Sequence, residues 1–204
     1  LVGLILSGLG INKLRQTSLL DNSPLVEFLE ETLPCEKIQG SIDAGLLHAL
    51  SITASGYGSG QSVTFYQGVS EIVPWRRARR IGIPVQIGIR HLLASSALPF
   101  IFPATLINRE YFGDGSMRQM APISSALHLG ADRVLVVGVR QEATSTSVRD
   151  ETAEYPSIAQ IAGHVLNSIF LDSLEADLER LQRINKTISL IPAHHLRESG
   201  VTLR

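Results

Sequence analysis

The chain has 204 residues, of which 44% are hydrophobic and 18% are charged. This composition is typical of a compact globular domain and excludes a disordered or fibrous protein. The 18 basic and 19 acidic residues leave a formal net charge of −1. No overall positive field therefore favours nucleic acid, and any partner has to be recognised by a local group of residues.

The cysteine content and the first residues bear on the compartment of the protein and on whether it has a membrane-spanning segment. The single cysteine, Cys35, excludes an internal disulfide and is compatible with a reducing compartment, so we expect the cytoplasm. The first residues, LVGLIL, have neither a methionine nor a cationic segment, and they are too few to span a membrane. We expect one domain over residues 1–204 that is incomplete at its N-terminus and belongs to a longer protein.

Two helices and a hairpin are predicted in the first part of the chain. The pair Ser23-Pro24 is a typical helix start, and the helix should end at the next proline. A shorter amphipathic helix is predicted over residues 38–49. Strands at 51–54 and 61–67 are joined by the segment GYGSG, which favours a turn. A phosphate-binding loop is the alternative, but the Lys-Ser/Thr ending of that motif is missing.

Helices and strands alternate in the second part. The predicted elements are a helix at 87–97, a strand at 105–107, a turn at 108–110, a helix at 121–130, a strand at 134–139, a long helix at 156–185 and a last strand at 186–192. The run 134–139 is continuously apolar, which is typical of a strand buried on both faces of a parallel sheet. The order of elements predicts an α/β fold.

An acidic residue between two glycines, Gly113-Asp114-Gly115, follows a short apolar run. Glycine has no Cβ, so it tolerates positive φ and lets another backbone or a substrate approach the neighbouring carboxylate. This arrangement suits a catalytic base. The alternative is a turn aspartate that is hydrogen-bonded to its own backbone.

The sequence on both sides of this motif carries a family resemblance. The segment ASSALP (residues 94–99) lies upstream, and GADRV (residues 130–134) lies downstream. Together with the acidic motif they resemble the patatin-like phospholipase family, in which an Ala-Ser-Ser-Ala-x-Pro segment precedes an Asp-Gly-Gly or Asp-Gly-Ala motif and a Gly-Ala-Asp-x-Val strand follows. The resemblance covers roughly residues 19–139. Ser116 stands where the family usually has Gly or Ala.

The resemblance implies a three-layer α/β sandwich with a mostly parallel central sheet. It also implies a serine lipid acyl hydrolase, a phospholipase or esterase, that uses a Ser-Asp dyad and needs no metal or organic cofactor. Asp114 would be the catalytic base. The residues expected to form the motif and pocket around it are Gly113, Gly115, Ser116, Ser95, Ser96 and Pro99.

The nucleophile of this dyad is not in the chain. The family's Gly-x-Ser-x-Gly elbow and glycine-rich oxyanion loop occur nowhere in the 204 residues. Ser95 and Ser96 lack the flanking glycine that such an elbow needs. We therefore expect the nucleophile upstream and this piece alone to be inactive. The alternatives are a non-catalytic lipid-binding or interaction module and an esterase for short soluble esters. The sequence leaves open which head group and acyl chain the substrate has and what the oligomeric state of the protein is.

A basic cluster, WRRARR, places four guanidinium groups beside an indole. Arginine pairs well with phosphate and tryptophan favours a membrane interface. The residues Arg76, Arg77, Arg79 and Arg80 are therefore candidates for contact with a lipid head group, with peripheral membrane contact as the consequence. The alternative is an exposed face paired with acids such as Glu71. No His-x-x-x-His or Cys pair indicates a metal site.

Overall fold

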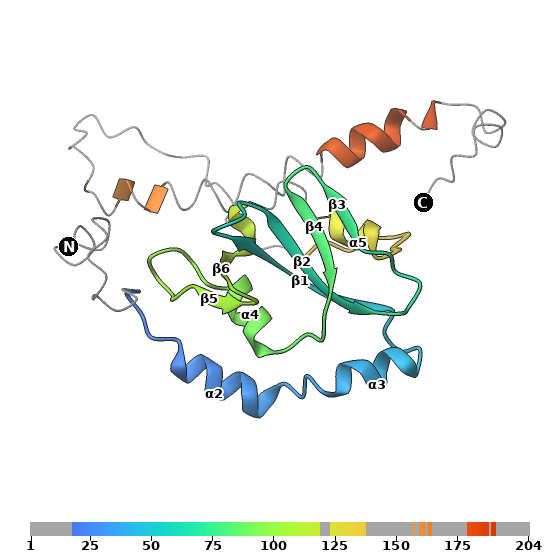
Figure 1. The fold of residues 1–204 in the computed structure, drawn as a ribbon. Coiled ribbons are helices and arrows are strands. Elements are labelled where there is room, and N and C mark those ends of the chain that lie inside the picture. The colour runs from blue at the N-terminus through green and yellow to red at the C-terminus, as the bar shows by residue number, and fades with distance from the viewer. Residues whose placement is uncertain are drawn as a thin grey trace. The chain divides into compact units, whose positions relative to one another are not determined.

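The computed structural model describes residues 18–118, 123–137, 157, 160–161, 163–164, 179–187 and 189–190. The chain divides into two compact units, Leu1–Gly130 and Ala131–Arg204. The first unit contains a six-stranded sheet with helices (Figure 1). It positions all the candidate site residues named above, so the fold of this unit is described first.

The strands of the sheet lie in the order β3-β4-β2-β1-β6-β5. Their bounds are β1 Ala49–Gly56, β2 Ser62–Gly68, β3 Trp75–Arg77, β4 Arg80–Pro84, β5 Thr105–Ile107 and β6 Glu110–Asp114. Only the pair β2–β4 is parallel, and the other neighbouring strands are antiparallel. The α/β fold is confirmed, and the sheet formed by the described strands is mixed, with four antiparallel pairs and one parallel pair where a mostly parallel sheet was expected. The hairpins β1–β2, β3–β4 and β5–β6 have short connections, which can join only antiparallel strands.

Two of these hairpins turn within two residues. Asn108 and Arg109 join β5 to β6 with φ values of 45° and 72°, and Arg79 in the β3–β4 turn has φ 57°. Positive φ at both turn residues, as in the β5–β6 hairpin, matches the twist of the flanking strands. The predicted hairpin at GYGSG is confirmed as β1–β2, and the strand at 105–107 is confirmed as β5.

The helices described in the first unit are α2 (Ser23–Thr32), α3 (Lys37–Asp43), α4 (Ile89–Ser95), the 3₁₀ turn η1 (Gly115–Met117) and α5 (Ser124–His128). The helix predicted from Ser23-Pro24 is confirmed as α2. The helix predicted over 38–49 is shorter, because Gly45 takes a φ of 70° two residues past its end and Ala49 already belongs to β1. Gly130, with φ 95°, follows the end of α5 as expected.

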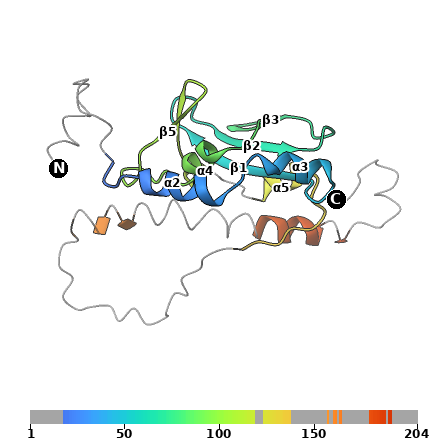
Figure 2. The same cartoon turned by 90° about the horizontal axis from the view of Figure 1, so that it is seen from below.

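Helices cover both faces of the sheet. In the view of Figure 1, α2 and α3 run below the strands, and Figure 2 shows them in front when the molecule is seen from below. Phe65 of β2 contacts His91 of α4, whereas the next residue along the strand, Thr64, is bonded to Ser125 of α5. Successive side chains of a strand point to opposite faces, so α4 and α5 lie on opposite sides of β2. The unit therefore has three layers.

The main core lies between the sheet and α4. It consists of Ala54, Val63, Phe65, Ala94, Ile107 and Phe112, with Ile81 and Val85 packed against it. The rings of Phe65 and Phe112 meet edge to face with centroids 5.3 Å apart, a favourable geometry for aromatic pairs. This core fixes β1 and β6 against α4, and the candidate aspartate lies at the end of β6.

The strand predicted at 134–139 is not present in its described part. Residues 134–137 are unpaired, and the side chains of Leu135 and Val137 are 90% and 89% exposed. A strand needs a hydrogen-bonding neighbour for its backbone groups, and residues 134–137 are not part of any strand pair. The apolar composition of the run does not predict whether a partner strand is present. Residues 138–139 lie outside the described part.

The last predicted elements fall mostly outside the described residues. Within the helix predicted at 156–185, residues 160–161, 163–164 and 179–185 are helical or belong to helical turns. Lys186 and Thr187 are also helical, where a strand was expected to begin. The Thr187 hydroxyl donates to the Arg183 carbonyl oxygen at 2.9 Å, one helical turn back, as a threonine within a helix can. The single-domain assignment stays a prediction.

Candidate active site

Asp114 is the last residue of β6, and its backbone is held from two sides. It pairs with Ala54 of β1, and its N–H donates to the carbonyl oxygen of Ala97 at 2.9 Å. Ala97 belongs to the ASSALP segment, which begins in the last residues of α4 and continues beyond it, and the side chain of Ala97 is buried. Two motifs that are separated in the sequence are therefore joined by a direct hydrogen bond.

The carboxylate of Asp114 is half-buried, and its two oxygens differ. Oδ1 accepts the Ser116 backbone N–H at 2.9 Å and also the Ser116 hydroxyl, and it caps η1. Within the described part of the chain, Oδ2 has no hydrogen bond. The turn aspartate and the catalytic base are thus compatible interpretations, because one oxygen fixes the carboxylate and the other stays open to a proton donor.

The two glycines beside Asp114 allow close approach. A Cβ on Gly115 would collide with the backbone carbonyl oxygen of Thr53 in β1, and a Cβ on Gly113 would lie 2.6 Å from the phenol oxygen of Tyr57. Neither glycine is among those with positive φ. Their role is therefore the close packing of neighbours, whereas the tolerance of positive φ is not used at either position.

Tyr57 is a site residue that the sequence analysis missed. It lies in the turn between β1 and β2, its N–H donates to the Tyr111 carbonyl oxygen at 2.9 Å, and its phenol lies against Gly113. Burial raises the pKa of Tyr57, and the negative charge of Asp114 raises this pKa further. The phenol therefore stays neutral near the carboxylate. The only signal in the sequence was an aromatic residue among glycines, which we interpreted as part of a turn.

The residues around this site match a known protein family. The model of the family described as patatin-like phospholipase matches residues 4–127, which include Asp114 and both glycines. This chain belongs to the patatin-like phospholipase family. No curated protein and no solved structure shows significant similarity to it. The family is one of lipid acyl hydrolases, which act on ester bonds.

The serines of this patatin-like chain that precede the acidic motif lie at the C-terminal end of α4. The Ser96 hydroxyl is exposed and donates to the carbonyl oxygens of Leu92 at 3.0 Å and Leu93 at 3.4 Å. Ser95 and Pro99 are half-buried. A nucleophile elbow places its serine between a strand and the start of a helix, so the end of α4 has the wrong local geometry.

The four arginines of the basic cluster do not share one surface. Arg77 of β3 pairs with Arg80 of β4, and both lie on the face that carries α5. Arg76 pairs with Ile81, which packs against the core on the opposite face. Arg79 lies in the turn. The alternation of side chains along β3 separates these groups, and a patch of four adjacent arginines does not form.

Trp75 is held inside this hairpin. Its indole stacks on the ring of Tyr66 at a centroid distance of 5.2 Å and on the ring of His128 at 4.8 Å. It also covers Gly82, where a Cβ would collide with the indole. The Trp75 indole is thus packed between β4 and α5. These packing contacts fix its position, and no contact with a membrane is needed to explain it. Within the described residues, Glu71 forms no ion pair with the cluster.

A cavity of about 480 Å³ opens elsewhere in the sheet. Its walls include Tyr66, Gln67 and Gly68 at the end of β2. Asp114 instead aligns with Ala54 and Val63, near the beginning of β2. The cavity is therefore distant in register from the carboxylate. Among the described residues, there is no group of three metal-ligating side chains, and no helix is long and apolar enough to cross a bilayer.

Proposed function

We propose that this chain is the aspartate-bearing part of a serine lipid acyl hydrolase in which Asp114 is the general base. The observation that carries the proposal is the state of the carboxylate. It is half-buried, oriented through Oδ1 by Ser116, and without a hydrogen bond at Oδ2 within the described residues. A base must be fixed and yet have one oxygen available, and Asp114 meets both requirements.

In the proposed reaction, a serine from a part of the polypeptide outside these residues is the nucleophile. Asp114 Oδ2 accepts the hydroxyl proton as the serine oxygen attacks the acyl carbonyl carbon. The proton then passes to the departing alcohol or lysolipid, and the C–O ester bond breaks to leave an acyl-serine. Water attacks the acyl-serine in the second half of the cycle, and Asp114 accepts the water proton. This proton returns to the serine oxygen as the bond between the acyl carbon and the serine breaks, which releases the carboxylic acid and restores the serine. Acyl transfer of this kind requires no metal.

Tyr57 supports this proposal through the protonation of its phenol. A neutral phenol beside Asp114 adds no second negative charge, because burial and the carboxylate both raise the pKa of Tyr57. Its ring also covers one side of the glycine motif. Access to the carboxylate is therefore expected from the side that Tyr57 does not cover.

A non-catalytic lipid-binding module is the second candidate. The observation that favours it is the absence of a Gly-x-Ser-x-Gly segment from all 204 residues. Such a segment upstream in the encoded full-length protein would favour the enzyme. An esterase for short soluble esters shares the chemistry of the first proposal and differs from it only in the substrate.

Hydrolysis of a chromogenic acyl ester by the full-length protein tests the proposal. We expect Asp114→Asn to lower turnover by ~10²–10⁴, the usual contribution of a general base. Asparagine keeps an oxygen that can accept from Ser116, so η1 and the fold should be retained, which thermal unfolding will check. Asp43→Asn, at the exposed end of α3, is the matched control and should keep full activity.

Equal turnover in wild type and Asp114→Asn would remove Asp114 from the mechanism. Loss of the fold in Asp114→Asn is distinguished by the unfolding curve, and Asp114→Ser, which restores a short acceptor, then serves as the second variant. Parallel assays on a short soluble ester and on phospholipid vesicles separate the esterase from the lipid hydrolase. Vesicle binding without hydrolysis of either substrate would support the non-catalytic module.

A further inference from the structure

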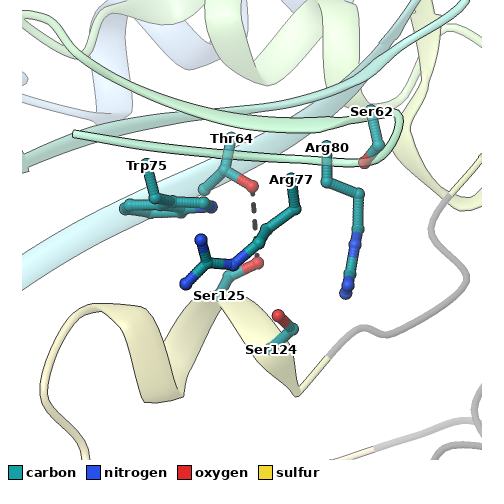
Figure 3. Close-up of a pocket in the computed structure, with 7 residues that line it drawn as sticks. All are labelled: Ser62, Thr64, Trp75, Arg77, Arg80, Ser124 and Ser125. Carbon is teal, nitrogen blue, oxygen red and sulfur yellow. Dashed lines mark hydrogen bonds between the residues drawn. The ribbon is translucent and has the colours of Figure 1, made fainter.

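A small polar pocket lies on the opposite side of the sheet from α4. We name it the α5-side pocket, and the residues that line it are Ser62, Thr64, Trp75, Arg77, Arg80, Ser124 and Ser125. The strand residues come from β2, β3 and β4, and the last two serines begin α5. Figure 3 shows the two arginine side chains extending from the strands toward the level of the α5 serines. We propose that this pocket binds a phosphate-type oxyanion.

The α5-side pocket carries two positive charges without a negatively charged partner among the described residues. Arg77 and Arg80 are directly opposite each other in the β3–β4 hairpin. Like charges at directly opposite positions destabilise a pair of strands. Neither guanidinium group has an ion pair or hydrogen bond with another described residue. Two adjacent, uncompensated guanidinium groups are a suitable arrangement for an anion that accepts several hydrogen bonds at once.

Hydroxyl groups complete the pocket on the side away from solvent. Ser62 and Thr64 are 4% and 5% exposed. The Thr64 hydroxyl lies 3.4 Å from that of Ser125, and Figure 3 marks this contact. A hydroxyl can rotate to donate to a ligand oxygen while it accepts from a neighbour. The pocket therefore offers neutral donors inside and charged donors at its mouth.

The size of the pocket limits the ligand. The enclosed volume is about 10 Å³, which is room for a group of the size of one water molecule. A single phosphate oxygen fits there, and the remainder of the group would lie at the mouth between Arg77 and Arg80. Trp75, fixed by its stacking between Tyr66 and His128, forms a rigid side wall. A large organic ligand would not enter.

This site is separate from the proposed catalytic carboxylate. Asp114 pairs with Ala54, whose side chain belongs to the core on the α4 face, whereas the α5-side pocket lies on the other face. Anion binding therefore does not rest on the hydrolase proposal. The same phosphate chemistry is present in a phospholipid head group and in a free phosphate ester, and the two sources need different assays.

Thermal unfolding of the full-length protein with inorganic phosphate is the test, with chloride at equal ionic strength as the reference. A ligand that binds only the folded state raises the unfolding temperature. We expect this rise for wild type and for Arg76→Gln, whose arginine is on the opposite face. We expect its loss in the double variant Arg77→Gln/Arg80→Gln. The double variant should also be more stable than wild type without phosphate, because a like-charge repulsion is removed.

An equal phosphate-dependent rise in wild type and in the double variant would mean an adventitious ion only and would overturn the proposal. If the double variant does not fold, Arg77→Gln alone decides the question, since this side chain is exposed. These readouts are independent of ester hydrolysis. Failure of the pocket and failure of the catalytic proposal are therefore distinguishable.

Vesicle flotation separates the two sources of phosphate. The probes are phosphatidylcholine vesicles with and without phosphatidic acid. Flotation that requires phosphatidic acid, is lost in the double variant and is competed by inorganic phosphate identifies a lipid head group as the ligand. Phosphate-dependent stabilisation without flotation supports the pocket as a site for a soluble phosphate ester. Arg76→Gln is again the matched control.

Discussion

The two faces of β2 are buried by different means. Val63 and Phe65 point toward α4 and pack among apolar side chains, whereas Ser62 and Thr64 point toward α5 and are buried among hydroxyl and guanidinium groups. On the first face, burial of apolar area supplies the stability. On the second face, each polar group needs a partner, and the net gain per hydrogen bond is small. The apolar face thus fixes the fold, and the polar face leaves donors available for a ligand.

Phe65→Ala gives the largest effect expected from this comparison. The Phe65 side chain is 2% exposed and contacts the rings of His91 and Phe112. Its truncation leaves a cavity between the sheet and α4 and should lower the free energy of unfolding by ~3–5 kcal/mol. Urea denaturation measures this change. A loss below ~1 kcal/mol would show that this face is not the principal core.

Thr64→Val, at the neighbouring position, should have a smaller effect. Valine has nearly the same shape, so only the hydroxyl is lost, with its contacts to Thr53 at 3.2 Å and to Ser125 at 3.4 Å. We expect the free energy of unfolding to fall by ~1 kcal/mol. Thr105→Val on β5, a half-buried threonine, is the matched control and should be close to neutral. A loss as large as that of Phe65→Ala would contradict the distinction between the faces.

Local signals in the sequence predicted the described α-helices of the first unit and the strands β1, β2 and β5, but they did not predict β3, β4 and β6. Proline and glycine positions marked the start of α2 and the end of α5, and the alternation in residues 61–67 predicted β2. These features depend on neighbours within a few residues. The strand predicted at 134–139 is absent from its described residues, 134–137, because an apolar run forms a buried strand only where a partner strand exists, and composition contains no information about that partner.

The acidic motif of the candidate site was predicted from local sequence, but the neighbours of its residues were not. The glycines marked Asp114, because close approach to a backbone requires a residue without Cβ. The contact of Tyr57 with Gly113 depends on the register of β1 with β6, and the pairing of Arg77 with Arg80 depends on the register of β3 with β4. Register is set by pairing between distant residues. No local pattern in WRRARR or GYGSG could therefore place these side chains.

The smallest predicted effect is a pH dependence from His91, which borders the apolar face. Burial lowers the pKa of His91, and its hydrogen bond to Gly88 opposes this shift only in part. Because the folded-state pKa lies below the ordinary value of 6.5, the unfolded chain takes up a proton first as the pH falls. The contribution of His91 to stability is therefore complete above pH ~6.5 and is lost as the pH falls toward the folded-state pKa.

The variant His91→Asn separates this contribution from other titrations. In the structure, His91 Nδ1 accepts the Gly88 N–H at 3.0 Å, and an asparagine oxygen can occupy the same place without titrating. We expect the free energy of unfolding of His91→Asn to fall less steeply below pH ~6.5 than that of wild type. His48→Asn changes an exposed histidine and serves as the control. Identical slopes for wild type and His91→Asn would mean that the apolar face does not exclude the charged imidazole, which would weaken the contrast between the two faces.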